Sequence, residues 1–207
     1  VAWVLVSAAL VLFMTPGLAL FYGGMDRSRN VLNMLMMNFW CMLSIPVLWV
    51  IVGYSIAAGN FDAQWFGGFD AAFLGNQNLA VDGGDASLLT IAFLGMFAVI
   101  TPALISGAVA DRMKFTAWAI FAPVWMLLVF KWVYGGWLGV RGSLDFAGGT
   151  AIHVNAGIAA LVAVLILGKR KGWPKEGHPP HSMPLPPRSA GCACTTTQPD
   201  VPRSPWS

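Results

Sequence analysis

The sequence has 207 residues, of which 57% are hydrophobic and only 10% are charged, and its mean hydropathy is +0.67. Soluble domains are about half apolar and a quarter charged, so this composition excludes an ordinary soluble domain and indicates several membrane spans. The net charge of +3 does not indicate a nucleic-acid partner, because the Lys and Arg residues cluster at the ends of apolar runs. Three cysteines in this pattern make neither a disulfide framework nor a zinc site, and no cofactor is expected.

The first two apolar runs predict membrane-spanning helices over residues 2–24 and 31–58. The first is too long for the apolar core of a signal peptide and has no basic leading segment, so we interpret it as a span. Pro16 is expected to kink it, because proline removes a helical hydrogen bond. The chain opens on Val rather than Met, from which we expect that a few residues precede it.

Residues 59–86 follow, with four aspartates and no Lys or Arg, which is typical of a loop that faces away from the cytoplasm. Three further spans are predicted over 87–110, 115–133 and 146–168. The fold class is therefore an all-α polytopic membrane protein with five spans. We expect a bundle over 1–172 and a tail over 173–207.

The distribution of basic residues predicts the orientation of these spans. Eight basic residues lie on one side of the predicted topology, and two on the other. The first group is Arg27, Arg29, Arg112, Lys114, Lys169, Arg170, Lys171 and Lys175; the second is Lys131 and Arg141. Because basic residues accumulate in cytoplasmic loops, the N-terminus is expected outside and the tail in the cytoplasm of a cell membrane.

The tail changes character after Gly172, because it becomes rich in Pro and Ser without apolar periodicity. One interpretation is a disordered cytoplasmic tail. The other is a truncated chain, or a coding frame that changes near Leu185. Both interpretations remain open at this point.

His153 is the only titratable group within the fifth apolar run, about 12 Å inside it if each residue after Asp145 adds roughly 1.5 Å. A titratable ring at that depth usually faces a bundle interior or a water-filled path, although a satisfied packing histidine is the alternative. Asp145 is expected to cap the helix by accepting backbone N–H bonds. Small residues that permit close helix approach follow, namely Gly148, Gly149 and Gly157.

Three long motifs carry a family likeness: LVLFMTPGLALFYGG, FLGMFAVITPALISGAVADRMKF and LDFAGGTAIHVNAGIAALV. They closely resemble the ammonium transporter family, Amt with its Mep and Rh relatives, over residues 1–185. The resemblance implies about eleven spans in two inverted five-helix repeats, and a homotrimer with one pore in each subunit. This chain resembles the first repeat only. We therefore expect a truncated, inactive half of a transporter, with an ammonium sensor or a structural membrane subunit as the alternative.

The resemblance also implies roles for particular residues. His153 matches the first pore histidine, and Phe97 matches the aromatic of the outer site that also gates the pore. Phe93 lies one helical turn away on the same face. Asp145 matches the acid beneath the outer site. Two more residues are expected to be structural: Asn155, the only polar side chain between His153 and Lys169, and Pro102, which is expected to kink the third span beside the pore.

One further aromatic of the outer site should lie among Trp132, Tyr134 and Trp137, and Tyr134 is the best match. The segment is shorter here than in the family pattern, and Lys131 departs from that pattern because a cation there would repel ammonium.

Physical chemistry supports the implied substrates, ammonium and ammonia, with methylammonium as a further substrate. An aromatic face attracts a desolvated cation by about 0.5 to 2 kcal/mol. An ion in an apolar pore loses many kcal/mol of hydration, whereas neutral ammonia does not. An imidazole on the path can accept the proton. An enzyme would need paired carboxylates, an activated nucleophile or metal ligands, so we expect no catalytic activity.

Overall fold

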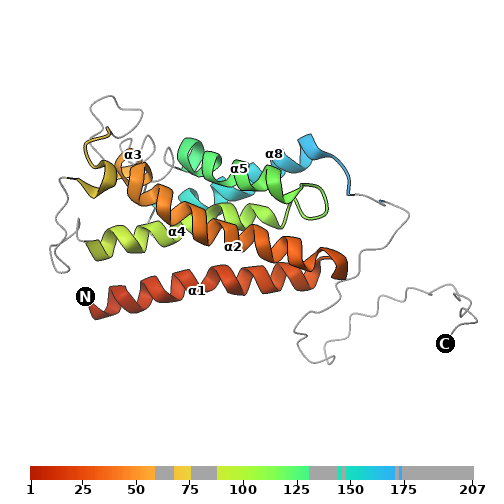
Figure 1. The fold of residues 1–207 in the computed structure, drawn as a ribbon, viewed down its shortest axis with the longest axis horizontal. Coiled ribbons are helices and arrows are strands. Elements are labelled where there is room, and N and C mark those ends of the chain that lie inside the picture. The colour runs from red at the N-terminus through yellow and green to blue at the C-terminus, as the bar shows by residue number, and fades with distance from the viewer. Residues whose placement is uncertain (59–67, 76–87, 131–143, 146–147, 171–172, 174–207) are drawn as a thin grey trace, which may run out of the picture.

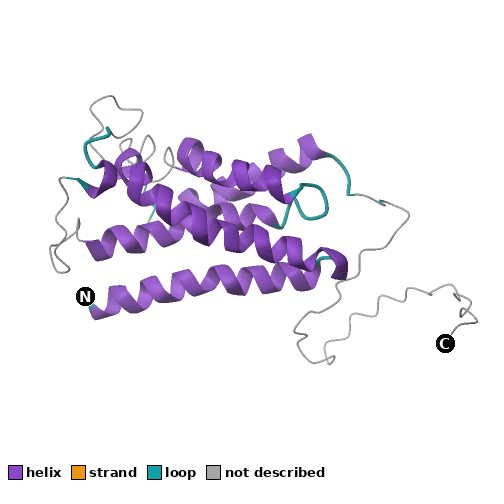
Figure 2. Ribbon diagram, in the orientation of Figure 1, coloured by secondary structure: helices purple, strands orange, loops and turns teal. Residues whose placement is uncertain are grey.

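A computed structural model describes residues 1–58, 68–75, 88–130, 144–145, 148–170 and 173. All regular structure within these ranges is helical (Figure 2). The expectation of an all-α fold with five helical segments is confirmed. The segments are, in chain order, α1 (Ala2–Met25); η1 (Ser28–Asn30), α2 (Val31–Leu48), η2 (Trp49–Gly53) and α3 (Tyr54–Ala58); α4 (Leu88–Ser106); α5 (Phe115–Trp125) with η5 (Met126–Phe130); and η6 (Gly149–Val154) with α8 (Asn155–Leu167). A 3₁₀ turn, η3 (Ala72–Leu74), lies between α3 and α4.

Four of these segments are long and apolar enough to cross a membrane. They are Ala2–Met25, Ser28–Ala57, Leu88–Ser106 and Gly149–Leu167, with mean hydropathies between 2.0 and 2.4. The segment Phe115–Phe130 is apolar but shorter. The last residues of the fourth predicted span, 131–133, lie outside the described residues. Helices satisfy their own backbone hydrogen bonds, which is what hydrocarbon surroundings require.

Two prolines precede π-helical turns at the same spacing. The N–H of Trp49 donates to the carbonyls of Ile45 and Pro46, and the N–H of Met126 donates to those of Ala122 and Pro123. Proline removes one helical hydrogen bond, and each π-helical turn begins three residues after its proline. Pro16 lies inside the continuous helix α1, and its kink stays a prediction.

Helix α4 lies at the centre of the bundle. It contacts α1, α2, α5 and α8 (Figure 1). Half of the most apolar stretch of α4 is buried inside the bundle, compared with 11% of the corresponding stretch of α1. Gly95 permits a close approach, because a Cβ atom there would lie 2.9 Å from Cδ1 of Trp49. The indole of Trp49 also donates to the carbonyl of Ile91 at 3.1 Å. The central position of α4 therefore depends on a small residue facing a large one.

Tryptophan side chains also join α2 to α5. Nε1 of Trp118 donates to the carbonyl of Met37 at 2.8 Å, and Nε1 of Trp40 donates to that of Ala119 at 3.0 Å. Trp118 is completely buried, and its ring fills part of the core. Its single N–H is paired with the carbonyl of Met37, as a buried indole requires.

A buried polar contact joins α2 to α4. Nδ2 of Asn38 donates to Oγ of Ser106 at 3.1 Å and to the carbonyl of Met34 at 2.9 Å, and the Ser106 hydroxyl donates to the carbonyl of Ala103 at 2.7 Å. Asn38 and Ser106 have no exposed surface. Hydrogen bonds of this kind hold membrane helices in register, because hydrocarbon offers no alternative partner.

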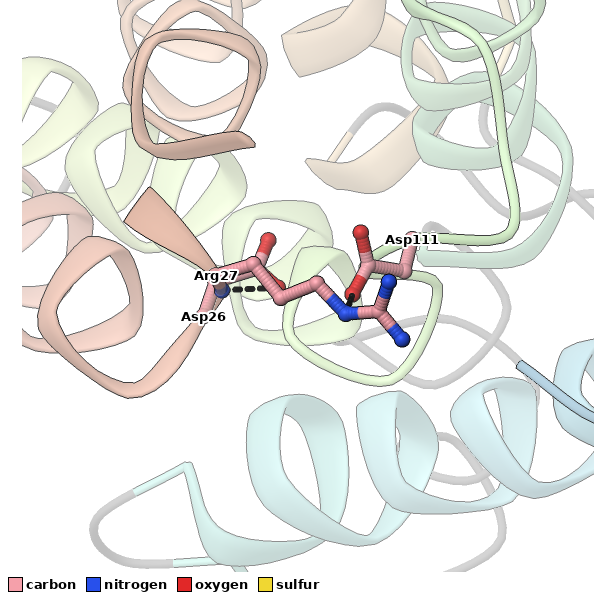
Figure 3. Close-up of polar contacts among 3 residues, drawn as sticks. All are labelled: Asp26, Arg27 and Asp111. Carbon is pink, nitrogen blue, oxygen red and sulfur yellow. Dashed lines mark hydrogen bonds and ion pairs between the residues drawn. The ribbon is translucent and has the colours of Figure 1, made fainter. Parts of the chain in front are cut away.

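An ion pair joins the α1–α2 turn to the α4–α5 connection (Figure 3). Nε of Arg27 lies 3.5 Å from Oδ2 of Asp111, and the backbone N–H of Arg27 donates to Oδ1 of Asp26 at 2.9 Å. Asp111 adopts a left-handed backbone conformation, with φ of 59°. Arg170, just after α8, lines a small cavity together with Asp26. The two connections and the end of α8 therefore meet at one end of the bundle.

Candidate functional site

An aromatic pair lies on α4. The rings of Phe93 and Phe97 are edge to face, with their centroids 5.0 Å apart and their planes at 90°. Both side chains are half-buried. The expectation that the two rings share one helical face is confirmed. The pair presents a partly open aromatic surface of the kind that attracts a cation.

Thr101 and Pro102, on the helical turn that follows this pair, change the hydrogen bonding of the helix. Oγ1 of Thr101 donates to the carbonyl of Phe97 at 2.6 Å. Pro102 follows inside α4 and cannot donate to the carbonyl one turn earlier. A threonine that bonds back to the preceding turn and a proline both favour a bend, and both lie next to the aromatic pair. The kink at Pro102 stays a prediction.

Asp145 caps the start of the last helical segment. Its Oδ2 accepts hydrogen bonds from the backbone N–H groups of Thr150 at 3.0 Å and Ala151 at 2.9 Å. The prediction of a capping carboxylate is confirmed. Gly148 has φ of 74°, a left-handed conformation that glycine adopts without strain, and it lets the chain turn between the carboxylate and the helix. These hydrogen bonds therefore fix the position of Asp145 relative to the start of η6.

His153 lies in the π-helical η6, and its side chain is exposed on the part of the bundle that the structure describes. The ring does not face the interior of the described bundle, and its role as a pore histidine stays a prediction. The interior is occupied instead by Ala151 and Ile152, which are 3% and 4% exposed, because η6 packs that side against α4. The imidazole is thus left on the outer face, beside the exposed Val154.

The apolar face of α8 continues from His153. Its exposed residues recur at helical spacing along one stripe, and they are Val154, Ile158, Leu161, Val162, Leu165 and Ile166. Gly157 lies on the same face, and nothing among the described residues comes within 4 Å of its Cβ position. No described helix approaches Gly157 closely, so its role in helix packing stays a prediction. A titratable ring stands at one end of an otherwise apolar surface.

Asn155 faces the opposite way from this stripe. It is 9% exposed, and its buried Nδ2 atom has no hydrogen-bond partner among the described residues. The structural role that we expected for Asn155 stays a prediction. In α1, Oγ1 of the fully buried Thr15 likewise has no hydrogen-bond partner in the part of the chain that the structure describes.

The structure brings the segments of the candidate site together only in part. The η6–α8 segment that carries His153 packs against α4, which carries Phe93 and Phe97. The aromatic candidates Trp132, Tyr134 and Trp137 and the cation Lys131 lie outside the described residues.

Sequence reasoning missed Thr101 and the Asn38–Ser106 contact. The signal for Thr101 is its place directly before Pro102, because a hydroxyl there can bond back to the preceding turn. The signal for Asn38 is an amide within an apolar run, but only the structure identifies its partner, which lies 68 residues away.

Comparison with known proteins agrees with this arrangement. The model of the Ammonium Transporter Family matches residues 2–186. An ammonium transporter of Mycobacterium tuberculosis (strain ATCC 25618 / H37Rv) is 48% identical over an alignment that covers 89% of this chain and 45% of that protein. The crystal structure of Candida albicans Mep2 has a TM-score of 0.71 and 31% identity, covering 82% of this chain and 39% of that one. A solved structure named Sensor Amt Protein has a TM-score of 0.73 and 25% identity, covering 82% of this chain and 44% of that one. The chain spans about half the length of the curated relatives it matches.

Proposed function

Because the chain belongs to the Ammonium Transporter Family, we propose that the protein carries ammonium or ammonia across a membrane and that these helices supply one wall of the pathway. The observation that carries the proposal is the family match over residues 2–186, which includes Phe93, Phe97, Asp145 and His153. The geometry of those residues supports it. Transport, with no catalytic activity, is the function we assign, and methylammonium is a further substrate.

In this proposal, the aromatic pair on α4 and the capped start of η6 form the entrance. The faces of Phe93 and Phe97 attract ammonium by about 0.5 to 2 kcal/mol, which concentrates the ion without trapping it. Asp145 holds the start of η6 in place and adds negative charge nearby. Tyr134 is proposed as a further aromatic of this entrance.

Beyond the entrance, the substrate passes as neutral ammonia along the apolar face of α8. A bare ammonium ion would lose its hydration there, at a cost of many kcal/mol, so the ion must first release a proton. His153, exposed at the start of that face, is the group placed to accept or relay it. Potassium has no proton to release and is excluded.

A closed path needs a second wall, because His153 and the stripe on α8 are exposed on the described bundle. We propose that further polypeptide encloses this face in a protein that forms a homotrimer with one pore in each subunit. The N-terminus lies outside a cell membrane. The end of the bundle that holds Arg27, Arg112 and Arg170 faces the cytoplasm, where basic residues accumulate.

The test compares His153→Ala with Val154→Ala in the protein as the cell makes it. Val154 is the matched control, because it is exposed in the same π-helical turn and is not titratable. We expect His153→Ala to change the ratio of charge moved to methylammonium taken up, or to admit potassium, whereas Val154→Ala preserves both. An unchanged ratio together with unchanged potassium exclusion would remove the relay role.

A second measurement tests the need for the second wall. We propose that residues 1–207 alone do not support ammonium-dependent growth of a transporter-deficient strain, because their titratable ring would meet lipid. Growth above the empty-vector control, abolished by His153→Ala but not by Val154→Ala, would contradict this.

An ammonium sensor is the second candidate, favoured by the likeness to the Sensor Amt Protein. A sensor would bind the ion at the aromatic pair without flux, and a structural subunit would do neither. Uptake of labelled methylammonium into vesicles distinguishes them, because only a transporter accumulates the label. Binding that Phe97→Leu abolishes, in a protein without uptake, would favour the sensor.

A further inference from the structure

Trp49 contacts α4 on the side opposite the aromatic pair. Its Nε1 donates to the carbonyl of Ile91 at 3.1 Å, and a Cβ atom at Gly95 would lie 2.9 Å from its Cδ1. Each of these two contacts lies two residues before one of the phenylalanines, and two residues turn a helix by about 200°. Ile91 and Gly95 are buried, whereas Phe93 and Phe97 are half-buried. The indole and the two rings therefore lie against opposite faces of the same two helical turns.

The indole of Trp49 is confined by neighbours on both helices. A Cβ atom at Gly53, in the same π-helical turn, would lie 3.2 Å from Cε3 of the indole, so the ring lies between this glycine and the one on α4. The rings of Tyr54 and Phe130 meet the indole edge to face, with centroids 5.9 and 6.4 Å away. These contacts fix the position of the indole, and its hydrogen bond to Ile91 fixes α4 relative to it.

The contact with Phe130 joins Trp49 to a second part of the chain that we assign to the entrance. Phe130 is the last residue of η5, and the segment that contains Tyr134 follows it directly in the sequence. Trp49 thus contacts both the helix that carries the aromatic pair and the residue from which that segment departs. It is 3% exposed, so it cannot contact an ion in the entrance itself.

We infer that Trp49 is a positioning residue for ammonium binding, because it fixes the part of α4 that holds Phe93 and Phe97. This role rests on the proposed function and concerns the same entrance. A cation is attracted when it lies over the face of an aromatic ring, within about 6 Å of the ring centre. A small shift of α4 therefore weakens the attraction even when both phenylalanines are present. Loss of the indole N–H removes the hydrogen bond that prevents this shift.

The test compares Trp49→Phe with Trp118→Phe in the protein as the cell makes it. Trp118 is the matched control, because it is also a buried tryptophan whose Nε1 donates to a backbone carbonyl, that of Met37 at 2.8 Å. The helices that it joins, α2 and α5, do not carry the aromatic pair. Uptake of labelled methylammonium gives KM and the maximal rate, and thermal unfolding gives the stability of each variant.

We expect Trp49→Phe to raise KM about three- to tenfold and to change the maximal rate by less than about twofold. The reason for this size is that complete loss of a cation–π contact corresponds to about two- to thirtyfold in affinity. Trp118→Phe should lower the unfolding midpoint by a similar amount and leave KM unchanged. If the unmodified protein binds ammonium without uptake, the dissociation constant from calorimetry replaces KM.

A second variant reaches the same contact from α4. Gly95→Ala should also raise KM, because the new Cβ atom would displace the indole of Trp49. Gly17→Ala is its control, because nothing lies within 4 Å of the Cβ position at Gly17. If Trp49→Phe does not fold, the comparison of these two glycine variants decides.

The outcomes separate the positioning role from the proposed function. Unchanged KM in Trp49→Phe and Gly95→Ala would overturn the positioning role and leave the proposed function intact. An equal rise of KM in Trp118→Phe would also overturn it, because any loss of core packing would then suffice. Absence of both uptake and ammonium binding in the unmodified protein would contradict the proposed function and the positioning role together.

Discussion

The ring of Tyr22 covers Gly107 so closely that a Cβ atom at Gly107 would lie 2.8 Å from Cζ of the ring. The hydroxyl of Tyr22 also donates to the carbonyl of Leu104 at 3.2 Å. The end of α1 is therefore attached to the end of α4 by a ring that needs a residue without a side chain below it.

Gly107→Ala should consequently lower stability by about 1 to 3 kcal/mol, the usual effect of overpacking a close contact. Gly17→Ala is the control, because nothing lies within 4 Å of its Cβ position, and alanine is the better helix former. Thermal unfolding followed by circular dichroism should show a lower midpoint for Gly107→Ala and an equal or higher midpoint for Gly17→Ala. Equal effects of the two variants would mean that the ring moves aside freely.

Removal of Arg27 should leave a buried carboxylate unpaired. The Asp111 side chain is only 4% exposed, so Arg27→Met is expected to destabilise the fold by about 3 kcal/mol. The double variant Arg27→Met/Asp111→Asn should recover at least half of that loss, because asparagine is neutral and tolerates the left-handed backbone at this position. Arg29→Met removes an exposed arginine two residues away and should have little effect. The same unfolding assay applies, and a double variant no better than the single one would contradict the argument.

Asp145→Ala should destabilise the start of η6, because two backbone N–H groups lose their acceptor. The expected loss is about 1 kcal/mol, as for other capping residues. Asp145→Asn retains an acceptor oxygen and should keep most of that stability while removing the charge. Methylammonium uptake by the two variants then separates geometry from electrostatics. If Asp145→Asn transports as poorly as Asp145→Ala, charge at the entrance matters more than the cap.

The stability of the fold should depend on pH through Asp26. Burial raises the pKa of its carboxyl above the ordinary value of 3.8, and Asp111 raises it further against the opposing effects of the Arg27 N–H and the Arg170 charge. Since the folded state binds the proton more tightly, this stabilisation is complete below the ordinary pKa and is lost as pH rises through the folded pKa. Asp26→Asn should therefore become more stable relative to the unmodified protein as pH rises from the ordinary pKa through the folded pKa, and the difference should stay constant above it.

Unfolding midpoints measured between pH values of about 4 and about 8 check this prediction. The variant keeps an oxygen that can accept the N–H of Arg27, so the change isolates the charge. Asp70→Asn, at an exposed acid, is the control and should shift the curve little. A difference between Asp26→Asn and the unmodified protein that does not grow with pH would contradict the prediction.

The sequence by itself determined the spans and the family. Hydrocarbon requires runs of about 20 apolar residues with internally paired backbones, so length and composition alone located the helices. Local contacts could also be predicted from the sequence. The Asp145 cap and the Phe93–Phe97 pair join residues only a few positions apart, where helical geometry determines which side chains can make contact.

Only the tertiary structure decided which way each helix faces. The sequence placed His153 within an apolar run but could not show that Ala151 and Ile152 take the side against α4 and leave the imidazole outside. It likewise could not show that the ring of Tyr22 packs on Gly107, or that Asp111 pairs with Arg27. The low charge and uniformly apolar composition of a membrane helix remove the polar stripe that marks the outer face of a soluble one, so orientation depends on contacts between residues distant in the chain.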